Sequence, residues 1–297
     1  MLLKISVLNN IHLLPKEREQ IQALSTRSVT FPEDMPTSDV ELIARTNGAE
    51  AILVTPGTKI TASYLDACPS VKYVGLCGTS TVNIDLNALD QRGVTFTNVV
   101  DYGDEPTAEF IFMQLIALAR GMGKYQWKKM PCELMGKTIG IIGLGALGKA
   151  IAHLALAFKM ITSYYSLHRK SDWEKRDVHY ADLHSLLSTS QIIVISTPSN
   201  VQILGKEEFA LLKTGSILVQ ASMGDTFDKS AFLKWIALKG NYALLDYAAG
   251  EQNYQTYKDL PHVIFPKIVA GYTYETKERL GRKVIKNLML YENKGFS

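Results

Sequence analysis

The chain has 297 residues and 46% hydrophobic content, enough for one or two compact domains that each bury a core. Its net charge is only +3, and the densest basic stretch, His168 to Arg176, is interrupted by Asp172 and Glu174, so we expect no nucleic-acid partner. The apolar runs are too short for a signal peptide or a membrane helix, which favours a cytoplasmic location with no membrane partner. Three cysteines without a CxxC pair predict reduced thiols and no metal site.

Strand-like and helix-like segments alternate through the first part of the chain, a pattern typical of a parallel sheet covered on both faces. The expected order is a strand at 2–8, a helix at 15–25, a strand at 28–31, a helix at 38–46, a strand at 51–54, a helix at 61–67 and a strand at 71–77. This pattern predicts a small α/β unit that ends near Tyr102.

A second α/β series follows a long apolar helix that is predicted over residues 107–120. Its six expected strands lie at 138–143, 161–166, 192–196, 216–222, 242–247 and 262–265, separated mostly by helical patterns such as 149–158 and 229–240. Six strands match a dinucleotide-binding sheet. A last helix, at about 274–291, lies outside this series, and we expect it to pack on the first unit.

The strongest local motif is GLGALG at 143–148, directly after one predicted strand and directly before an amphipathic helix. In that context Gly143 permits a tight turn, Gly145 lets the backbone approach a pyrophosphate, and Gly148 allows close packing of the helix on the strand. The first N–H groups of the helix, including those of Ala146 and Leu147, then face the phosphates. The alternative is a glycine-rich turn that binds nothing.

The end of the next strand, where NAD-preferring sites carry a carboxylate, has Ser166, His168, Arg169 and Lys170 instead. A hydroxyl and cationic groups suit the 2′-phosphate of NADP, so we predict a preference for NADP over NAD, with Arg169 as the pairing residue. The alternative is a solvated basic turn without a role.

The chain resembles the D-isomer-specific 2-hydroxyacid dehydrogenases along nearly its whole length. The matching segments are 52–99, Thr107 to Glu109, 136–152, 196–200, 216–232, 243–247 and 265–273. The resemblance implies two Rossmann-like α/β domains with doubly wound parallel sheets. Residues 1–102 plus 274–297 would form a flavodoxin-like substrate domain built from both chain ends, and residues 103–273 the dinucleotide-binding domain. It also implies a homodimer, an NAD or NADP cofactor, and a cleft that closes on the substrate.

That family uses an arginine to hold the substrate carboxylate, a histidine to exchange a proton, and a glutamate to orient the histidine. Met223 stands at the arginine position of this sequence and Lys267 at the histidine position, whereas Glu251 falls where the glutamate belongs. A thioether cannot replace a bidentate charged fork, and a lysine ammonium holds its proton near neutral pH. Activity on simple 2-hydroxy acids should therefore be crippled. Lys267 either acts with Glu251 on a different anionic carbonyl substrate or forms a plain ion pair with it.

Other positions carry over from the family with less change. Thr79 and Ser80 belong to the turn whose backbone binds a carboxylate, although Ser80 replaces a glycine. The residues expected along the cofactor are Thr197, Pro198, Ala221, Ser222 and Asp246.

Three functions remain open from the sequence. The first is an NAD(P)-dependent oxidoreductase with altered substrate choice, which would use Lys267 and Glu251. The second is a catalytically silent relative that binds a dinucleotide as a sensor or interaction module. The third is an enzyme of another class that reuses the same cleft, because a fold does not fix chemistry.

Overall fold

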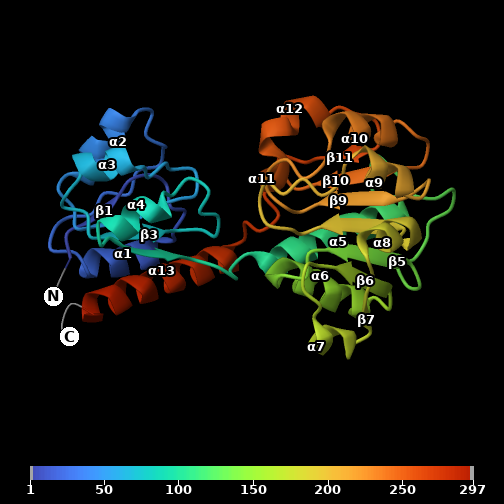
Figure 1. Ribbon diagram of the computed structural model, residues 1–297, viewed down its shortest axis with the longest axis horizontal. Helices are drawn as coiled ribbons and strands as arrows, with labels where there is room; N and C mark the ends of the chain where they lie inside the picture. Colours follow the sequence, from blue (N-terminus) through green and yellow to red (C-terminus); the bar gives the residue numbers. More distant parts are fainter. Residues whose placement is uncertain (1–2, 295–297) are drawn as a thin grey trace. The chain divides into compact units, whose positions relative to one another are not determined.

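The computed structural model describes residues 3–294, and the chain divides into two compact units (Figure 1). Unit 1 comprises Met1–Tyr102 and Thr273–Ser297, and unit 2 comprises Gly103–Tyr272. Both units are built on parallel sheets, which confirms the predicted α/β fold class. None of the helices within the described residues has the length and apolar composition that crossing a bilayer requires.

Unit 1 contains a parallel sheet in the order β1 (Ile5–Val7), β2 (Ala51–Val54), β3 (Tyr73–Leu76) and β4 (Thr95–Asn98). Its helices are α1 (Pro15–Ala23), α2 (Asp39–Thr46), α3 (Ala62–Ala67), α4 (Leu86–Gln91) and α13 (Tyr274–Lys294). Because side chains of a strand alternate between faces, Ile52 and Val54 enter one core and Leu53 enters the other. The second core includes residues of α13, which packs against α1, β3 and β4.

The strand predicted at 28–31 is wrong. Residues 28–31 belong to no strand, and an isolated bridge between Leu3 and Ser25 lies before them in the chain. The side chain of Gln22 explains the difference, because its Oε1 accepts from the Val29 N–H at 2.8 Å and its Nε2 donates to the Arg27 carbonyl at 3.0 Å. These bonds satisfy backbone groups that a neighbouring strand would otherwise pair.

Unit 2 contains a parallel sheet in the order β11-β10-β9-β8-β5-β6-β7. Its strands are β5 (Thr138–Ile142), β6 (Ile161–Tyr165), β7 (Val178–Tyr180), β8 (Ile192–Ile195), β9 (Ile217–Gln220), β10 (Tyr242–Leu245) and β11 (Val263–Ile264). The strand β7 lies at the sheet edge and was not predicted. The order reverses between β5 and β8, which is the switch point where doubly wound sheets bind ligands.

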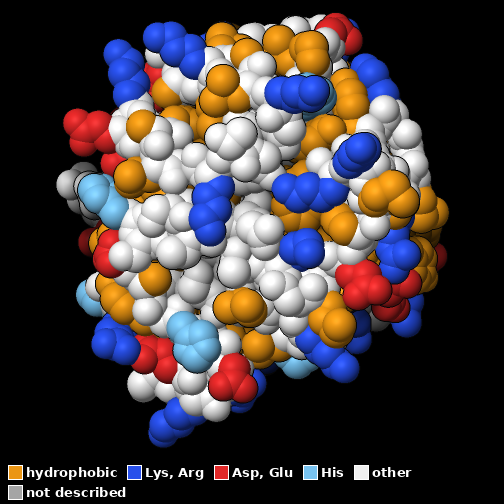
Figure 2. All heavy atoms as spheres, turned by 90° about the vertical axis from the view of Figure 1, so that its right-hand side faces the viewer, with side chains coloured by type: hydrophobic (Ala, Val, Ile, Leu, Met, Phe, Trp, Pro, Cys, Tyr) orange, Lys and Arg blue, Asp and Glu red, His pale blue; other side chains and the backbone are white. Residues whose placement is uncertain are grey.

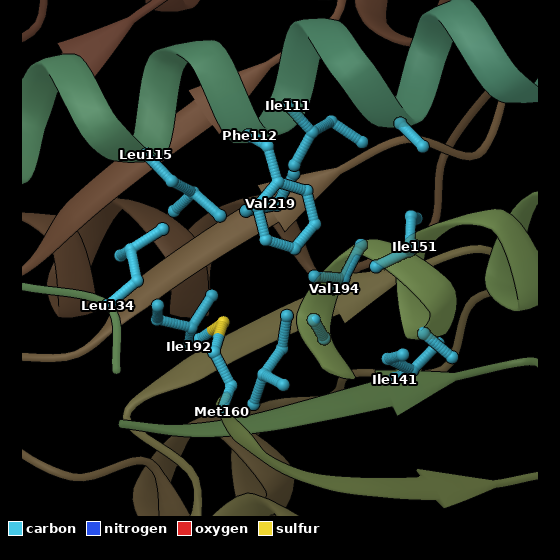
Figure 3. Packing of buried hydrophobic residues seen from close by; sticks show 14 of the residues in the cluster. Ile111, Phe112, Leu115, Leu134, Ile141, Ile151, Met160, Ile192, Val194 and Val219 are labelled. Carbon is cyan, nitrogen blue, oxygen red and sulfur yellow. The ribbon is translucent and has the colours of Figure 1, made fainter. Parts of the chain in front are cut away.

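Helices cover both faces of this sheet. They are α5 (Asp104–Arg120), α6 (Ala146–Ala157), α7 (Ser171–Glu174), α8 (Leu183–Thr189), α9 (Lys206–Leu211), α10 (Lys229–Ile236), α11 (Tyr247–Gly250), the 3₁₀ helix η1 (Glu251–Asn253) and α12 (Tyr254–Tyr257). Figure 3 shows how α5 packs, with Phe112 and Leu115 turned towards Val194 and Val219 of the sheet. Each core cluster among the described residues lies wholly within one unit.

Figure 2 shows the face of the molecule that lies on the right of Figure 1 and belongs to unit 2. Lys and Arg side chains are scattered over this face among apolar and uncharged ones, without joining into a continuous stripe. This distribution agrees with the balanced charge of the chain.

Candidate functional site

The pairing register of unit 2 places the carboxyl ends of its central strands level with one another. Ile142 pairs with both Tyr165 and Ile195, and Gln220 pairs with Ile195 and Leu245. The residues that follow these strands therefore meet at one edge of the sheet, around the switch point between β5 and β8. Most of the cofactor-binding residues predicted from the sequence lie at this edge.

Two glycines of the turn after β5 are required by packing. Gly143 has a φ of 97°, and a Cβ added there would lie 2.5 Å from the Ser196 carbonyl oxygen. A Cβ on Gly148 would lie 2.0 Å from the Gly143 carbonyl oxygen. The Ser196 hydroxyl donates to that same carbonyl at 2.7 Å, so the turn after β5 and the turn after β8 are packed together.

Gly145 differs from these two, because a Cβ there would meet nothing within 4 Å. Gly145 is the N-cap of α6 and provides no side-chain cap for the first N–H groups of the helix, which include those of Ala146 and Leu147. Unpaired N–H groups and the positive end of the helix dipole together attract phosphate. The turn therefore fits a pyrophosphate. Gly145, the glycine of the turn that packing does not require, lies where this ligand would approach.

The loops after β8 and β9 are tied to one another. The Ser222 hydroxyl donates to the Thr197 carbonyl at 2.8 Å, and the Ala221 N–H donates to the Ile195 carbonyl at 3.1 Å. Pro198 follows Thr197 in the loop after β8. Ser222 is buried, and its hydroxyl is engaged with the loop after β8.

Gln220 is a site residue that sequence reasoning missed. It is the last residue of β9, it is buried, and its Nε2 donates to the Gly224 carbonyl at 2.8 Å. This bond and the one from the Asn200 N–H to the Met223 carbonyl, 2.9 Å long, hold the loop 221–224 in place. The Met223 side chain is 45% exposed and projects from this fixed loop.

Asp246 was expected within the strand but lies just after β10, as the N-cap of α11. One carboxylate oxygen accepts from the Ala249 N–H at 3.2 Å, and the other accepts from the Ala270 N–H at 2.7 Å. Burial raises the pKa of Asp246, and the backbone hydrogen bonds oppose that rise. Asp246 thus fixes the segment that carries Lys267 relative to the one that carries Glu251.

Lys267 and Glu251 are joined through a third residue, Tyr247, which the sequence gave no signal to single out. The Tyr247 hydroxyl donates to Glu251 Oε1 at 3.1 Å, and Lys267 Nζ lies 5.8 Å from the centre of the Tyr247 ring. Partial burial and the bond to Glu251 raise the pKa of the Tyr247 hydroxyl, which therefore stays protonated. Within residues 3–294, no ion pair connects Lys267 directly to Glu251.

The basic turn after β6 contains a pairing that the sequence did not predict. Arg169 forms an ion pair with Glu174 of α7, its Nε donating to Oε1 at 3.1 Å, and its guanidinium lies 5.0 Å from the centre of the Tyr180 ring. The Ser166 hydroxyl donates to the His168 carbonyl at 2.5 Å. The side chains of His168 and Lys170 have no hydrogen-bonded or ionic partner in the part of the chain that the structure describes.

Unit 1 presents the loop 77–80 after β3. The Thr79 hydroxyl donates to the Val99 carbonyl at 3.0 Å, and the Thr79 carbonyl accepts from Asn98 Nδ2 at 3.0 Å. Thr79 is exposed and Ser80 is half-buried. Cys77 is buried, which raises the pKa of its thiol to about 12 and excludes it as a thiolate nucleophile near neutral pH. No group of three possible metal ligands occurs among the described residues.

Residues 111–267, more than half of the chain, match the family model described as "D-isomer specific 2-hydroxyacid dehydrogenase, NAD binding domain". The chain belongs to the D-isomer specific 2-hydroxyacid dehydrogenase family. The match spans the glycine turn, the loops after β8, β9 and β10, and Lys267.

Curated members of the 2-hydroxyacid dehydrogenase family align over most of their length. The glyoxylate reductase of Thermococcus kodakarensis is 28% identical, over 89% of this chain and 86% of its own. That of Korarchaeum cryptofilum is 29% identical, over 88% and 85%. Among solved structures, the apo form of D-lactate dehydrogenase from Escherichia coli has a TM-score of 0.83 at 21% identity and covers 98% of this chain and 97% of its own, which shows a shared fold.

Proposed function

We propose that this protein is an NAD(P)-dependent oxidoreductase that reduces the carbonyl of a small anionic substrate, a 2-oxo acid or a related compound. The observation that carries the proposal is the open backbone at Gly145, at the N-terminus of α6 and at the switch point of the sheet. Similarity to glyoxylate reductases supports the class of reaction. When bound, the reduced nicotinamide supplies a hydride for the carbonyl carbon.

The residues of unit 2 divide into those that bind and those that position. The turn 143–148 would bind the pyrophosphate, and the loops that begin at Thr197, Ala221 and Asp246 would shape the rest of the cofactor site. Three side chains form hydrogen bonds that hold those loops in place, and we assign them positioning roles: Gln220, Ser222 and Asp246. In unit 1, the exposed backbone at Thr79 and Ser80 is the proposed place for a carboxylate.

The chemistry at the carbonyl would rest on Lys267, Tyr247 and Glu251. Lys267 offers a fixed positive charge for a developing oxyanion or a carboxylate. The Tyr247 hydroxyl donates to Glu251 Oε1, and its ring lies beside Lys267, so Tyr247 would orient the carboxylate next to this charge. Met223 offers only a thioether, so the carboxylate grip that an arginine would provide at this position is missing.

The adenosine end favours NADP in this proposal. Ser166, His168, Arg169 and Lys170 offer a hydroxyl and up to three cationic groups to a 2′-phosphate. A homodimer, a cytoplasmic location and the absence of nucleic-acid and membrane partners are further proposals, based on the family resemblance and on composition.

The second candidate is a dinucleotide-binding protein without catalysis, acting as a sensor or interaction module. The observation that favours it is the half-exposed thioether of Met223, which projects from a loop that the Gln220 hydrogen bond still holds in place. Loss of one preorganised charged donor typically lowers the rate by about 100- to 1000-fold.

The paired substitution Met223→Arg with Lys267→His tests whether the rest of the site still supports reduction of a 2-oxo acid, and turnover by the native chain separates the two candidates. We expect NADPH oxidation with glyoxylate or pyruvate to rise by about 100-fold over the native chain, because the carboxylate grip and the proton-exchanging imidazole both return. Met130→Arg, at another exposed methionine of unit 2, is the control for an added positive charge. The native chain should turn over some member of a wider panel of anionic carbonyl compounds. Dinucleotide binding without turnover of any of them would favour the sensor.

A further inference from the structure

Glu174 is the last residue of the short helix α7, which brings it back to the end of β6. The Tyr164 hydroxyl, which comes from β6 itself, donates to Glu174 Oε1 at 2.9 Å. The Lys170 N–H donates to the same Tyr164 hydroxyl oxygen at 2.6 Å. Tyr164 therefore ties the basic turn to α7 and fixes the Glu174 carboxylate beside it.

The Glu174 carboxylate occupies two donors of Arg169. Nε and Nη2 of the guanidinium both bond to it, in the bidentate arrangement that a phosphate would also use. Arg169 is 65% exposed whereas Glu174 is 23% exposed, so the carboxylate is the better-fixed partner. The hydrogen bond from Arg169 also lowers the pKa of Glu174, which keeps the carboxylate charged at neutral pH.

A 2′-phosphate that approached Arg169 would meet this carboxylate. It would have to share or displace the bidentate pair, and it would lie close to a negative charge that Tyr164 holds in place. The same carboxylate does not oppose the uncharged ribose hydroxyl of NADH. The charge of Arg169 is thus partly neutralised in advance, while the side chains of His168 and Lys170 have no ionic partner within the described residues.

We propose that Glu174 is a specificity-determining residue that restrains the preference for NADPH by neutralising Arg169 and repelling the adenosine 2′-phosphate. This inference rests on the proposed dinucleotide binding. It concerns affinity alone, so it holds whether or not the protein turns over a substrate.

The inference is tested by calorimetric titration of the full chain and of its Glu174→Gln variant with NADPH and with NADH. The amide keeps an oxygen to accept from Tyr164, but it removes the charge. We expect the Kd for NADPH to fall by about fivefold, the range that one exposed ion pair supports, with the Kd for NADH changed by less than about twofold. Asp172→Asn is the matched control, since Asp172 is exposed on the same short helix and has no ionic partner among the described residues.

Repeating the substitution in the Arg169→Gln protein tests whether Glu174 acts through Arg169. In Arg169→Gln, the added substitution Glu174→Gln should give a smaller gain for NADPH, because no guanidinium is released. An unchanged Kd for NADPH in Glu174→Gln, an equal change for NADH, or an equal gain in Asp172→Asn would overturn the inference. Failure of the native chain to bind either dinucleotide would instead overturn the proposed function.

Discussion

The three glycines of the turn 143–148 have different structural roles. Gly143 and Gly148 are required because backbone atoms lie where their side chains would begin. Gly145 is required by nothing within the protein, which is why its role points to a ligand. The position of the motif between a strand and a helix predicted these separate roles, but not the close approach of the turn after β8 to Gly143.

Substitution of these glycines by alanine should therefore separate folding from binding. Gly148→Ala should lower the free energy of unfolding by about 3 kcal/mol, because the contact at 2.0 Å involves backbone that cannot move aside freely. Gly145→Ala should change it by no more than about 1 kcal/mol, since the added methyl group meets only open space. Urea denaturation monitored by circular dichroism measures both.

The same Gly145→Ala protein should bind NADPH at least about tenfold more weakly, because its methyl group stands where the pyrophosphate approaches. A fully stable Gly145→Ala protein with native affinity for NADPH would show that the phosphates lie elsewhere.

At the scale of elements, the α2 N-terminus in unit 1 gives a pH-dependent contribution to stability. Thr37 donates to the Glu41 carboxylate from both its N–H and its hydroxyl, each at 2.8 Å, and Arg45 adds a third bond. Ser38 completes the cap by accepting from the Glu41 N–H at 3.2 Å. The backbone bond from Thr37 is the largest cause that lowers the pKa of Glu41, to about 2.

A carboxyl group whose pKa is lowered by folding stabilises the protein fully at pH values above its pKa in the unfolded state. This stabilisation is lost as the pH falls towards its pKa in the folded state. The stabilisation from Glu41 should thus be complete above about pH 4.5 and decline towards pH 2. We expect Glu41→Gln to have a lower melting temperature than the native chain at pH 7, by an amount that shrinks below pH 4.5. Glu19→Gln, at an exposed position of α1, is the control, and a pH-independent difference for Glu41→Gln would contradict the assignment.

The elements that sequence reasoning found are those with continuous buried runs, such as β2, β5, β8 and β9. It missed β4, whose residues are exposed or half-buried, and β7, which has three residues. It placed a strand at 28–31 because the apolar pattern of that segment does not reveal the hydrogen bonds from Gln22. Hydrophobic pattern thus predicted the central strands and the edge strands β1 and β11, but it missed the edge strands β4 and β7.

The candidate site was predictable wherever a residue directly follows a central strand. Gly143, Thr197 and Ala221 needed only the strand pattern to be placed at one edge. The contacts of Tyr247 and Glu174 were not predictable in this way. They depend on how a short helix packs after its strand, which the strand pattern does not show. Tyr247 lies in the matching segment 243–247, but nothing in that segment indicates its bond to Glu251, and Glu174 lies in no matching segment.

At the scale of the whole molecule, each unit has its own cores, and the candidate dinucleotide site lies wholly within unit 2. The turn 143–148, the basic turn after β6, and the loops that carry Met223, Asp246 and Lys267 all belong to residues 103–272. We therefore expect unit 2 to bind the cofactor by itself, whereas the replacements at Met223 and Lys267 should affect the chemistry carried out with the bound cofactor.

The most direct test of dinucleotide binding is a calorimetric titration of the purified, intact chain with NADPH and with NADH. We predict saturable binding of one dinucleotide per chain, with a lower Kd for NADPH than for NADH. Binding with the opposite order would contradict the role proposed for the basic turn after β6. The absence of binding to either dinucleotide at millimolar concentration would contradict the central claim that the Gly145 turn holds a pyrophosphate.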